Sequence, residues 1–433
     1  MSRVVVIGAG LTGLVAAERL ARSGLSAQVV EREPEPGGAC RSLVQDGFTF
    51  DLTGHLLHVQ QRAAEDYLRG FGLWEGLEVH ERRAAVVVGG RITPYPIQIH
   101  THGLEDSVRR DCLLGFIRAW AAAKAAEPID FRQWVLGRFG EGLARHFFFP
   151  YNSKLFRAEP EELSLDWVGR YVPKPDLEEV VDGALGLHRR PVGYNAVFRY
   201  PAEGGIRQLP DAIARRVPEL ELETEVVAVD LADRAVELAD GRRLDFEALV
   251  STVSLPALID LLAEKLPEEI SAARRRLRWV RVLNLALGVE GAAPRPEHWL
   301  YFADPAIPYY RVGFPSNHGR LAPDGCHTVS VEVSLPPDGG DVAEESAAAE
   351  RALVGAGLVD RSRVRVRRLS VIDPAYVVFD HARREAVALL RRYLAERGVL
   401  IAGRWAEWKY SAMEDAILDG MAVARRVAKA LAR

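Results

Sequence analysis

Hydrophobic positions near the N-terminus change their spacing twice within the first 31 residues. Residues 3–7, RVVVI, are a continuous apolar run, which is typical of a strand buried on both faces of a parallel sheet. The next segment, LTGLVAAERLARSG, has the apolar spacing of an amphipathic helix that ends at Gly24. A second apolar run, AQVV, then leads to Glu31. The pattern predicts a strand, a helix and a second parallel strand.

The middle of the chain divides into helical and strand-like parts. Apolar residues recur at helical spacing through most of 104–148. Residues 281–289, RVLNLALGV, and 327–335, HTVSVEVSL, are expected to be strands. Between these parts, residues 221–252 are expected to form a β-hairpin with its turn at Asp240–Gly241, followed by the strand ALVST. The chain is therefore expected to have an α/β fold with a helical part and a sheet part.

Glycines occupy the turn between the first strand and the first helix. The turn reads GAGLTG, so Gly8, Gly10 and Gly13 have the G-x-G-x-x-G spacing of a dinucleotide site. The first glycine makes the turn, the second lets the backbone approach a pyrophosphate, and the third lets helix and strand pack closely. Glu31 follows at the distance where a carboxylate accepts hydrogen bonds from a ribose 2′-hydroxyl. A Rossmann-like nucleotide site is predicted here.

Composition narrows the class of protein. The 433 residues suggest two or three domains. The formal net charge of −4 gives no electrostatic reason to expect a nucleic-acid partner. Three separated cysteines match no disulfide or zinc spacing, so we expect no metal site and a reduced, cytoplasmic compartment. We expect neither a signal peptide nor a membrane span, and the oligomeric state stays undetermined.

The residues after Glu31 favour FAD over NAD as the cofactor. Gly37, Gly38, Arg41 and Ser42 resemble the GGxxRS segment of amine-oxidase-type flavoproteins, in which the glycines and the arginine lie along the flavin diphosphate. The segment GFTFDLTGHLLH resembles the loop under the isoalloxazine ring of the same proteins. A simple NAD dehydrogenase would continue with another strand–helix unit. The resemblance therefore implies an FAD site.

The C-terminal residues are expected to complete this FAD site. Residues 399–403, VLIAG, read as a strand, and MAVARRVAKALA as a long helix after a loop. The N-terminus of that helix, around Met413, would direct backbone N–H groups at the cofactor. Arg404 would lie near the flavin, where a cation stabilises the anionic reduced ring. The resemblance also places Val226 or Val227, in the predicted hairpin, against the adenine.

Five segments resemble, in the same order, motifs of the eukaryotic-type UDP-galactopyranose mutases. These enzymes belong to the superfamily of amine oxidases and protoporphyrinogen oxidases. The match spans nearly the whole chain. The segments are RITPYPIQ, FPYNSKLF, LSLDWVGRYVPKP, HWLYFADPAIPYYRVGFPSN and GRWAEWKYS.

The resemblance carries residue roles over one at a time. It implies that Arg170 and Arg311 grip the diphosphate of a sugar nucleotide, which suits the bidentate bonding of guanidinium groups to phosphate. Gly54 and His55 match a loop that moves when the flavin is reduced. The other residues that it places around the substrate are Asn152, Tyr301, Tyr376 and Tyr410 at the diphosphate, Gln98 near the uridine, and Trp299 beside the sugar.

Some positions differ from the family pattern. Phe156 stands where the family has a tryptophan, Thr53 where it has a glycine, and His318 where it has a tyrosine that reaches the ligand. Phe156 and His318 are retained as expected substrate-binding residues. The phosphate-binding residues match, whereas the sugar end differs. Which sugar and which nucleobase are bound is therefore left open.

The reaction implied by the resemblance is an interconversion of pyranose and furanose rings. In the family, N5 of the reduced flavin attacks the anomeric carbon, and the nucleoside diphosphate leaves and returns. NADPH or another reductant must reduce the FAD, and the single G-x-G-x-x-G leaves no separate NADPH domain. The alternative is an oxidase or dehydrogenase of the amine-oxidase or protoporphyrinogen-oxidase type acting on a small molecule. A non-catalytic flavoprotein is a third possibility.

The expected architecture is a discontinuous FAD-binding domain with a helical insert and an antiparallel sheet that covers the flavin. The substrate would lie between sheet and helices. The expected segments are 1–90, 201–278 and 396–433 for the FAD-binding domain, 91–200 for the mainly helical substrate domain, and 279–395 for the antiparallel-sheet substrate domain.

Overall fold

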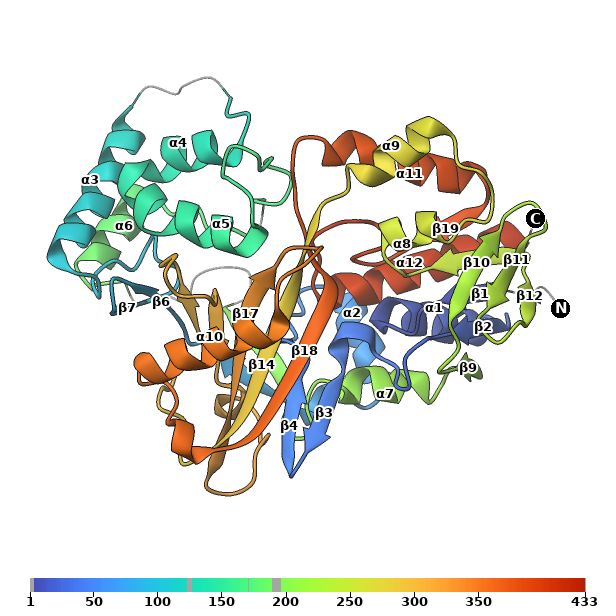
Figure 1. Cartoon of the computed structure of the whole chain (residues 1–433), viewed down its shortest axis with the longest axis horizontal. Helices are drawn as coiled ribbons and strands as arrows, with labels where there is room; N and C mark the ends of the chain where they lie inside the picture. The colour runs from blue at the N-terminus through green and yellow to red at the C-terminus, as the bar shows by residue number, and fades with distance from the viewer. Residues whose placement is uncertain (1–3, 123–126, 170, 189–195, 433) are drawn as a thin grey trace.

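The computed structural model describes residues 4–122, 127–169, 171–188 and 196–432. The fold is mixed α/β, as predicted. One half holds a parallel sheet, and the other half holds a larger mixed sheet beneath a group of helices (Figure 1). None of the helices in these ranges is both long and apolar enough to cross a bilayer.

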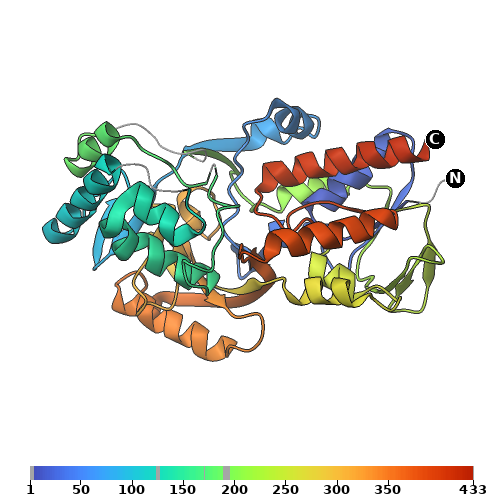
Figure 2. The same ribbon diagram turned by 90° about the horizontal axis from the view of Figure 1, so that it is seen from above.

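The parallel sheet has five strands in the order β19-β13-β1-β2-β9, and every pairing is parallel. Both faces are covered, which explains why β1 is continuously apolar. Val4 and Val6 pack in the core beneath α1 and α12, which lie side by side in Figure 2, whereas Val5 and Ile7 pack on the opposite face. The strands are β1 (Val4–Ile7), β2 (Ala27–Val30), β9 (Glu219–Glu221), β13 (Ala248–Ser251) and β19 (Val399–Ile401).

Helices cover this sheet on both sides, and the predicted first and last helices are confirmed. On the face where Val4 and Val6 pack, the helices are α1 (Leu11–Arg22), α2 (Arg62–Arg69), α7 (Gln208–Ala214) and α12 (Met413–Leu431). On the face where Val5 and Ile7 pack, they are α8 (Leu255–Asp260), α9 (Glu268–Arg275) and α11 (Arg383–Glu396).

The predicted hairpin at 221–252 is wrong in its topology. Residues 219–221 join the parallel sheet as β9, and the rest form a three-stranded antiparallel sheet before β13. The Asp240–Gly241 turn does connect two strands, with Gly241 at a φ of +85°. An additional turn comes before it, where Asp230 accepts a hydrogen bond from the Asp233 N–H. The three strands are β10 (Val226–Asp230), β11 (Ala235–Leu238) and β12 (Arg243–Asp245).

The second sheet has seven strands in the order β18-β14-β17-β16-β15-β6-β7. The strands predicted at 281–289 and 327–335 are confirmed as parts of β14 and β17. The sheet is not wholly antiparallel as expected, because β6 pairs in parallel with β15. Strand β6 lies within the segment assigned from sequence to the FAD-binding domain. The strands are β6 (Ala84–Val88), β7 (Arg91–Pro94), β14 (Trp279–Glu290), β15 (Trp299–Phe302), β16 (Arg311–Gly313), β17 (Cys326–Leu335) and β18 (Val364–Val377).

Helices predicted within 104–148 are confirmed and lie above one end of this sheet (Figure 1). Their shared core is aromatic, and Val280, Val282 and Tyr310 of the sheet region pack into it. The helices are α3 (Asp106–Ala121), α4 (Phe131–Leu143), the π-helical η3 (Ala144–Phe148), α5 (Phe149–Phe156) and α6 (Leu177–Ala184), with α10 (Val342–Gly355) against the sheet elsewhere.

Short elements connect the two halves. Two small antiparallel sheets pair β3 (Ser42–Gln45) with β4 (Phe48–Asp51), and β5 (Leu77–Glu81) with β8 (Val197–Pro201). The short 3₁₀ turns are η1 (Gly38–Cys40), η2 (Trp74–Gly76), η4 (Pro315–Asn317) and η5 (Arg361–Arg363).

Candidate functional site

A cavity of about 1550 Å³ lies between the two halves of the molecule. One end is lined by the Gly-rich turn after β1 and by the loop after β2. The middle is lined by residues 49–58 and by the start of α12, and the far end by the seven-stranded sheet and the helical insert. Segments far apart in the sequence thus share one continuous space.

The Gly-rich turn presents bare backbone to this cavity. Gly8 and Gly10 line it, and Gly8 has a φ of +100°. A Cβ added at Gly10 would meet no atom within 4 Å and would project into open space. Gly13 does not line the cavity. A Cβ added at Gly13 would lie 2.0 Å from the Gly8 carbonyl oxygen. The third glycine therefore serves helix–strand packing, as its place in the motif predicts.

Glu31, at the end of β2, is tied to this turn. Its Oε2 accepts a hydrogen bond of 2.7 Å from the Ala9 N–H, and its Oε1 accepts one of 3.1 Å from the Glu33 N–H. Each carboxylate oxygen has a second lone pair. Because Glu31 also lines the cavity, those lone pairs are suitably placed for ribose hydroxyls.

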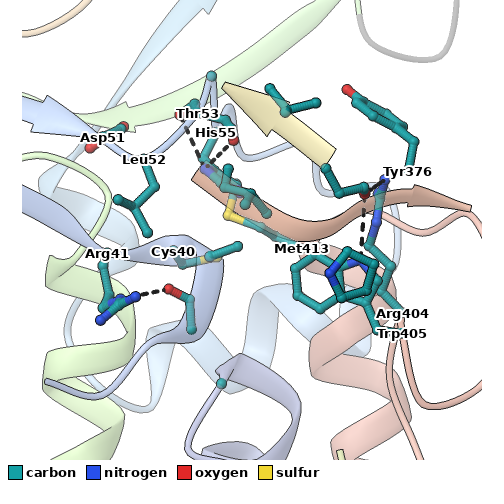
Figure 3. Close-up of a pocket in the computed structure, with 18 of the residues that line it drawn as sticks. Cys40, Arg41, Asp51, Leu52, Thr53, His55, Tyr376, Arg404, Trp405 and Met413 are labelled. Atoms are coloured by element: carbon teal, nitrogen blue, oxygen red, sulfur yellow. Dashed lines mark hydrogen bonds between the residues drawn. The ribbon is translucent and has the colours of Figure 1, made fainter. Parts of the chain in front are cut away.

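The segment after Glu31 folds back along the turn. The Gly37 N–H donates to the Ala9 carbonyl at 2.8 Å, and Gly37 and Gly38 both have positive φ. Arg41, labelled in Figure 3, donates to the Gly38 carbonyl and bonds to Glu33 at 2.7 Å. All three predicted residues line the cavity.

The remaining predicted cofactor residues also reach the cavity. Val226 lines it, whereas Val227 is not among its lining residues and is 48% exposed. Met413 begins α12 at the cavity wall, next to Arg404 (Figure 3). The bare backbone at Gly10, the uncapped N-terminus of α1 and the carboxylate of Glu31 together fit a dinucleotide such as FAD.

The loop from Leu52 to His55 lies in the middle of the cavity wall (Figure 3). The sheet holds it, since Asn284 on β14 donates to the Leu52 carbonyl at 2.8 Å. His55 bonds through Nδ1 to the Thr53 carbonyl at 3.2 Å. Burial lowers the pKa of His55 to about 4, despite that bond and the carboxylate of Glu332. His55 is therefore neutral at pH 7.

Arg311 lines the cavity and is paired with a carboxylate that sequence reasoning missed. Glu332 faces it across the β16–β17 register and accepts a hydrogen bond from Arg311 Nη2 at 2.5 Å. Glu332 is 2% exposed and also accepts from the Tyr310 hydroxyl. Burial alone would lower the pKa of Arg311, but Glu332 and nearby tyrosines outweigh it and hold the pKa well above its usual value. A glutamate within the apolar strand HTVSVEVSL was the available signal for a buried partner.

Arg404 forms a second cationic point beside two tyrosines. Its guanidinium carbon lies 5.3 Å from the ring centre of Tyr376 and 4.9 Å from that of Tyr410. Nη1 donates to the Ser411 carbonyl at 2.7 Å. Burial raises the pKa of the Tyr410 phenol, as does Tyr376, so its hydroxyl stays protonated. A protonated phenol and a guanidinium together suit an anionic ligand.

The aromatic stretch 298–311 divides between cavity and core. Trp299, Tyr301 and Arg311 line the cavity. Phe302 and Tyr309 pack against each other in the sheet core, with ring centres 4.8 Å apart. Within β15, strand alternation directs Trp299 and Tyr301 to the cavity side and Phe302 to the core side.

The predicted substrate residues of the helical insert line the far end of the cavity. The Gln98 amide donates to the Pro173 carbonyl at 2.9 Å, and the Asn152 amide to the Phe148 carbonyl at 2.7 Å. Phe156 is 2% exposed and lines the same end. Arg170 lies outside the described residues.

His318 lines a different part of the wall. Its ring lies edge-on to Tyr200 at 4.6 Å and to His298 at 5.4 Å. Burial and the neighbouring histidines hold its pKa well below the usual value, so the ring is neutral. Within the described ranges, no group of three or more His, Cys, Asp or Glu side chains is arranged to hold a metal ion.

Comparison with known proteins finds relatives of this chain. Over 414 residues the chain is 26% identical to 4,4′-diapolycopene oxygenase of Methylomonas sp., covering 81% of this chain and 80% of that protein. It is 25% identical over 167 residues to a probable UDP-galactopyranose mutase of Klebsiella pneumoniae, covering 37% of this chain and 42% of that protein.

A solved structure of reduced UDP-galactopyranose mutase is similar along almost its full length. The TM-score is 0.92 at 26% identity, with 99% of this chain and 96% of the other covered. The family model described as flavin containing amine oxidoreductase matches residues 11–428. The chain therefore belongs to the flavin-containing amine oxidoreductase family.

Proposed function

We propose that this protein is an FAD-dependent sugar-nucleotide mutase of the UDP-galactopyranose mutase type, an isomerase that interconverts pyranose and furanose rings. The observation that carries the proposal is Arg311, a partly buried cation that faces the cavity and is held in place by the buried Glu332. An amine or a polyene needs no such group, whereas a diphosphate does. The similarity to reduced UDP-galactopyranose mutase supports the same reading.

The chain's own groups would bind the diphosphate and stabilise it as it leaves. Within the described part of the chain, Arg311 bonds to Glu332 through Nη2 alone. Its other guanidinium nitrogens can therefore donate to phosphate oxygens. Tyr301, Tyr376 and Tyr410 line the same space, and their hydroxyls are proposed as further donors. In a cavity with little water, such preorganised donors stabilise developing negative charge more strongly than they would in solvent. Arg170 is proposed as a second arginine by the motif that contains it.

Reduced FAD, when bound, supplies the nucleophile for the anomeric carbon. Neutral His55 leaves no additional charge beside the site and keeps one ring nitrogen able to accept a proton. Gln98 is proposed to contact the nucleoside, and Asn152 the diphosphate. NADPH or another reductant is proposed to reduce the flavin before turnover.

An oxidase or dehydrogenase acting on a small molecule is the second candidate. It is favoured by the similarity to 4,4′-diapolycopene oxygenase, which covers 81% of this chain. The charged pair of Arg311 and Glu332 in the cavity wall counts against an apolar substrate, because an apolar ligand would cover the Arg311 nitrogens that do not bond to Glu332 and leave them without solvent or a polar partner.

An anaerobic assay distinguishes the two candidates. The purified protein, reduced with dithionite, is incubated with UDP-galactopyranose or UDP-galactofuranose, and the products are separated by chromatography. Interconversion that disappears with oxidised flavin is the expected result. If no sugar nucleotide is converted and UDP does not perturb the flavin absorbance, the mutase proposal is wrong.

A further inference from the structure

Lys154, on α5, binds three backbone carbonyls of one loop. Its Nζ donates to the carbonyl oxygens of Phe302 at 3.0 Å and Tyr309 at 3.3 Å, and also to that of Asp304. An ammonium group has three N–H donors and no acceptor. All three donors therefore have a partner, and all three partners lie between 302 and 309.

The loop that Lys154 holds joins the two strands that carry cavity residues. Strand β15 ends at Phe302, and β16 begins at Arg311. The loop also has its own turn, since the Asp304 carboxylate accepts from the Ala306 N–H at 2.9 Å. The Tyr309 carbonyl comes immediately before Tyr310 and Arg311, which both bond to Glu332. The position of the Tyr309 backbone therefore affects the position of Arg311, where the chain leaves the loop and β16 begins.

Helix α5 contributes to the opposite wall of the same cavity. Tyr151, Asn152, Leu155 and Phe156 line it. Lys154 lies between them in sequence but points away, into a separate groove of about 470 Å³. The helix is also attached to β17, because the Ser334 hydroxyl donates to the Leu155 carbonyl at 2.8 Å. Ser334 thus connects α5 to strand β17, whereas Lys154 connects α5 to the loop between β15 and β16.

We propose that Lys154 is a positioning residue for the nucleotide site, because it fixes the loop 303–309, and with it Arg311, relative to the helix α5 wall. The inference rests on the proposed function, since it concerns binding of a nucleoside diphosphate. Lys154 does not touch the ligand and acts only through the backbone of the loop. Holding the two walls in register reduces the ordering that binding would otherwise require.

Lys154 keeps its charged form at pH 7, although its surroundings lower its pKa. Asp304 attracts the ammonium, while the groove also contains Arg157 and Glu345. Burial lowers the pKa of Lys154 to about 8, against the effect of Asp304. The group is mainly protonated at pH 7. A neutral amine would keep only two N–H donors for three carbonyls.

Lys154→Met tests this contact, because methionine has a similar length and no N–H. Hydrogen exchange measured by mass spectrometry on the FAD-loaded protein should show faster exchange of the 303–309 amides, by about tenfold or more. Calorimetric titration should show a UDP Kd raised about tenfold with unchanged FAD content. Arg157→Met is the matched control, since Arg157 follows directly after the same helix and donates to the Ser334 carbonyl instead. It should leave exchange in 303–309 unchanged.

Chemical rescue separates positioning from a general loss of packing. Lys154→Cys in a Cys326→Ser background can be alkylated with 2-bromoethylamine, which restores an ammonium at nearly the original reach. The two other cysteines, Cys40 and Cys112, are buried. UDP affinity should return toward the wild-type value.

Unchanged exchange of 303–309 in Lys154→Met would show that the lysine does not hold the loop. Faster exchange with an unaltered UDP Kd would overturn its role in positioning the site. A wild-type protein that does not bind UDP overturns the proposed function itself, and the exchange data then still decide whether Lys154 holds the loop.

Discussion

The cavity has two walls that are built in different ways. The wall at the Gly-rich turn is mainly backbone, supplied by Gly8 and Gly10 at the turn and by the start of α1. The wall at the seven-stranded sheet is made of side chains, with Tyr301, Arg311 and Glu332 on three different strands. A backbone wall depends on side chains being absent, whereas a side-chain wall depends on each charged group keeping its partner. The two walls should therefore fail in different ways.

The largest effect is expected at the backbone wall, where Gly13 and Gly10 make a matched pair. Gly13→Ala places a Cβ 2.0 Å from the Gly8 carbonyl oxygen, a contact that side-chain movement cannot relieve. We expect little folded protein, or an apoprotein with a strongly lowered Tm. Gly10→Ala meets no protein atom within 4 Å, so its apoprotein should melt like the wild type but bind FAD weakly.

Thermal melts of both apoproteins and FAD titrations measure the two effects separately. If Gly10→Ala lowers the Tm as much as Gly13→Ala does, then the second glycine is needed for folding rather than for the ligand. If both variants bind FAD normally, the turn is not the cofactor site.

At the side-chain wall, the charge balance between Arg311 and Glu332 should dominate. Glu332→Ala leaves the partly buried guanidinium of Arg311 without its carboxylate, which should cost about 3 kcal/mol of folding stability. Arg311→Met combined with Glu332→Leu removes both charges and should recover much of that loss. The double variant should nevertheless lose UDP binding, since Arg311 is the residue proposed to donate hydrogen bonds to the phosphates.

Urea unfolding and UDP titration of the single and double variants check this expectation. A double variant that remains as unstable as Glu332→Ala would mean that the glutamate has a role other than pairing with Arg311. A double variant that binds UDP normally would remove Arg311 from the proposed site.

The same difference explains what the sequence could predict. The Gly-rich turn is local, so the spacing of Gly8, Gly10 and Gly13 was enough to predict β1, α1 and the turn between them. Glu332 is 21 residues from Arg311, and nothing local marks the pair. The extra turn before β11 was missed because no glycine or proline marks it, and Arg234 takes the positive φ of 52° instead. The parallel β6–β15 pairing joins strands more than 200 residues apart, which periodicity cannot reveal.

Asp51 lies between the two walls and should give a measurable pH dependence. Its carboxylate accepts hydrogen bonds from the Ser42 hydroxyl and the Tyr200 hydroxyl, both at 2.6 Å. Burial raises the pKa of Asp51 to about 6, although these bonds oppose the shift. Its pKa in the unfolded chain is about 3.9, so the folded state favours the protonated acid.

The sign follows from that order of pKa values. The stabilising contribution of Asp51 is complete below pH ~4 and is lost as the pH rises through about 6. Asp51→Asn cannot titrate, so relative to it the wild type should lose up to about 3 kcal/mol between pH 4 and pH 7. Urea unfolding of both proteins across this range measures the difference. Parallel profiles would mean that Asp51 titrates normally.

Two adjacent tyrosines give the smallest and most selective comparison within the side-chain wall. Tyr310 donates its hydroxyl to Glu332, whereas the buried hydroxyl of Tyr309 has no hydrogen-bond partner among the described residues. Tyr310→Phe removes a hydrogen bond to a charged group and should cost about 1.5–3 kcal/mol. It should also weaken UDP binding. Glu332 would lose the hydrogen bond from Tyr310 and would then be fixed less firmly beside Arg311.

Tyr309→Phe removes a hydroxyl that is buried without a partner, so stability should change by about 0.5 kcal/mol or less, or rise slightly. The ring itself stays packed against Phe302, with the centres 4.8 Å apart. Urea unfolding of the two phenylalanine variants makes the comparison at nearly identical burial. Equal losses for both would mean that ring packing, and not the hydroxyl bond to Glu332, stabilises this part of the wall. A loss of stability in Tyr310→Phe alone would show that the two neighbouring tyrosines have separate roles. Tyr310 would support the cavity through Glu332, and Tyr309 would pack in the sheet core.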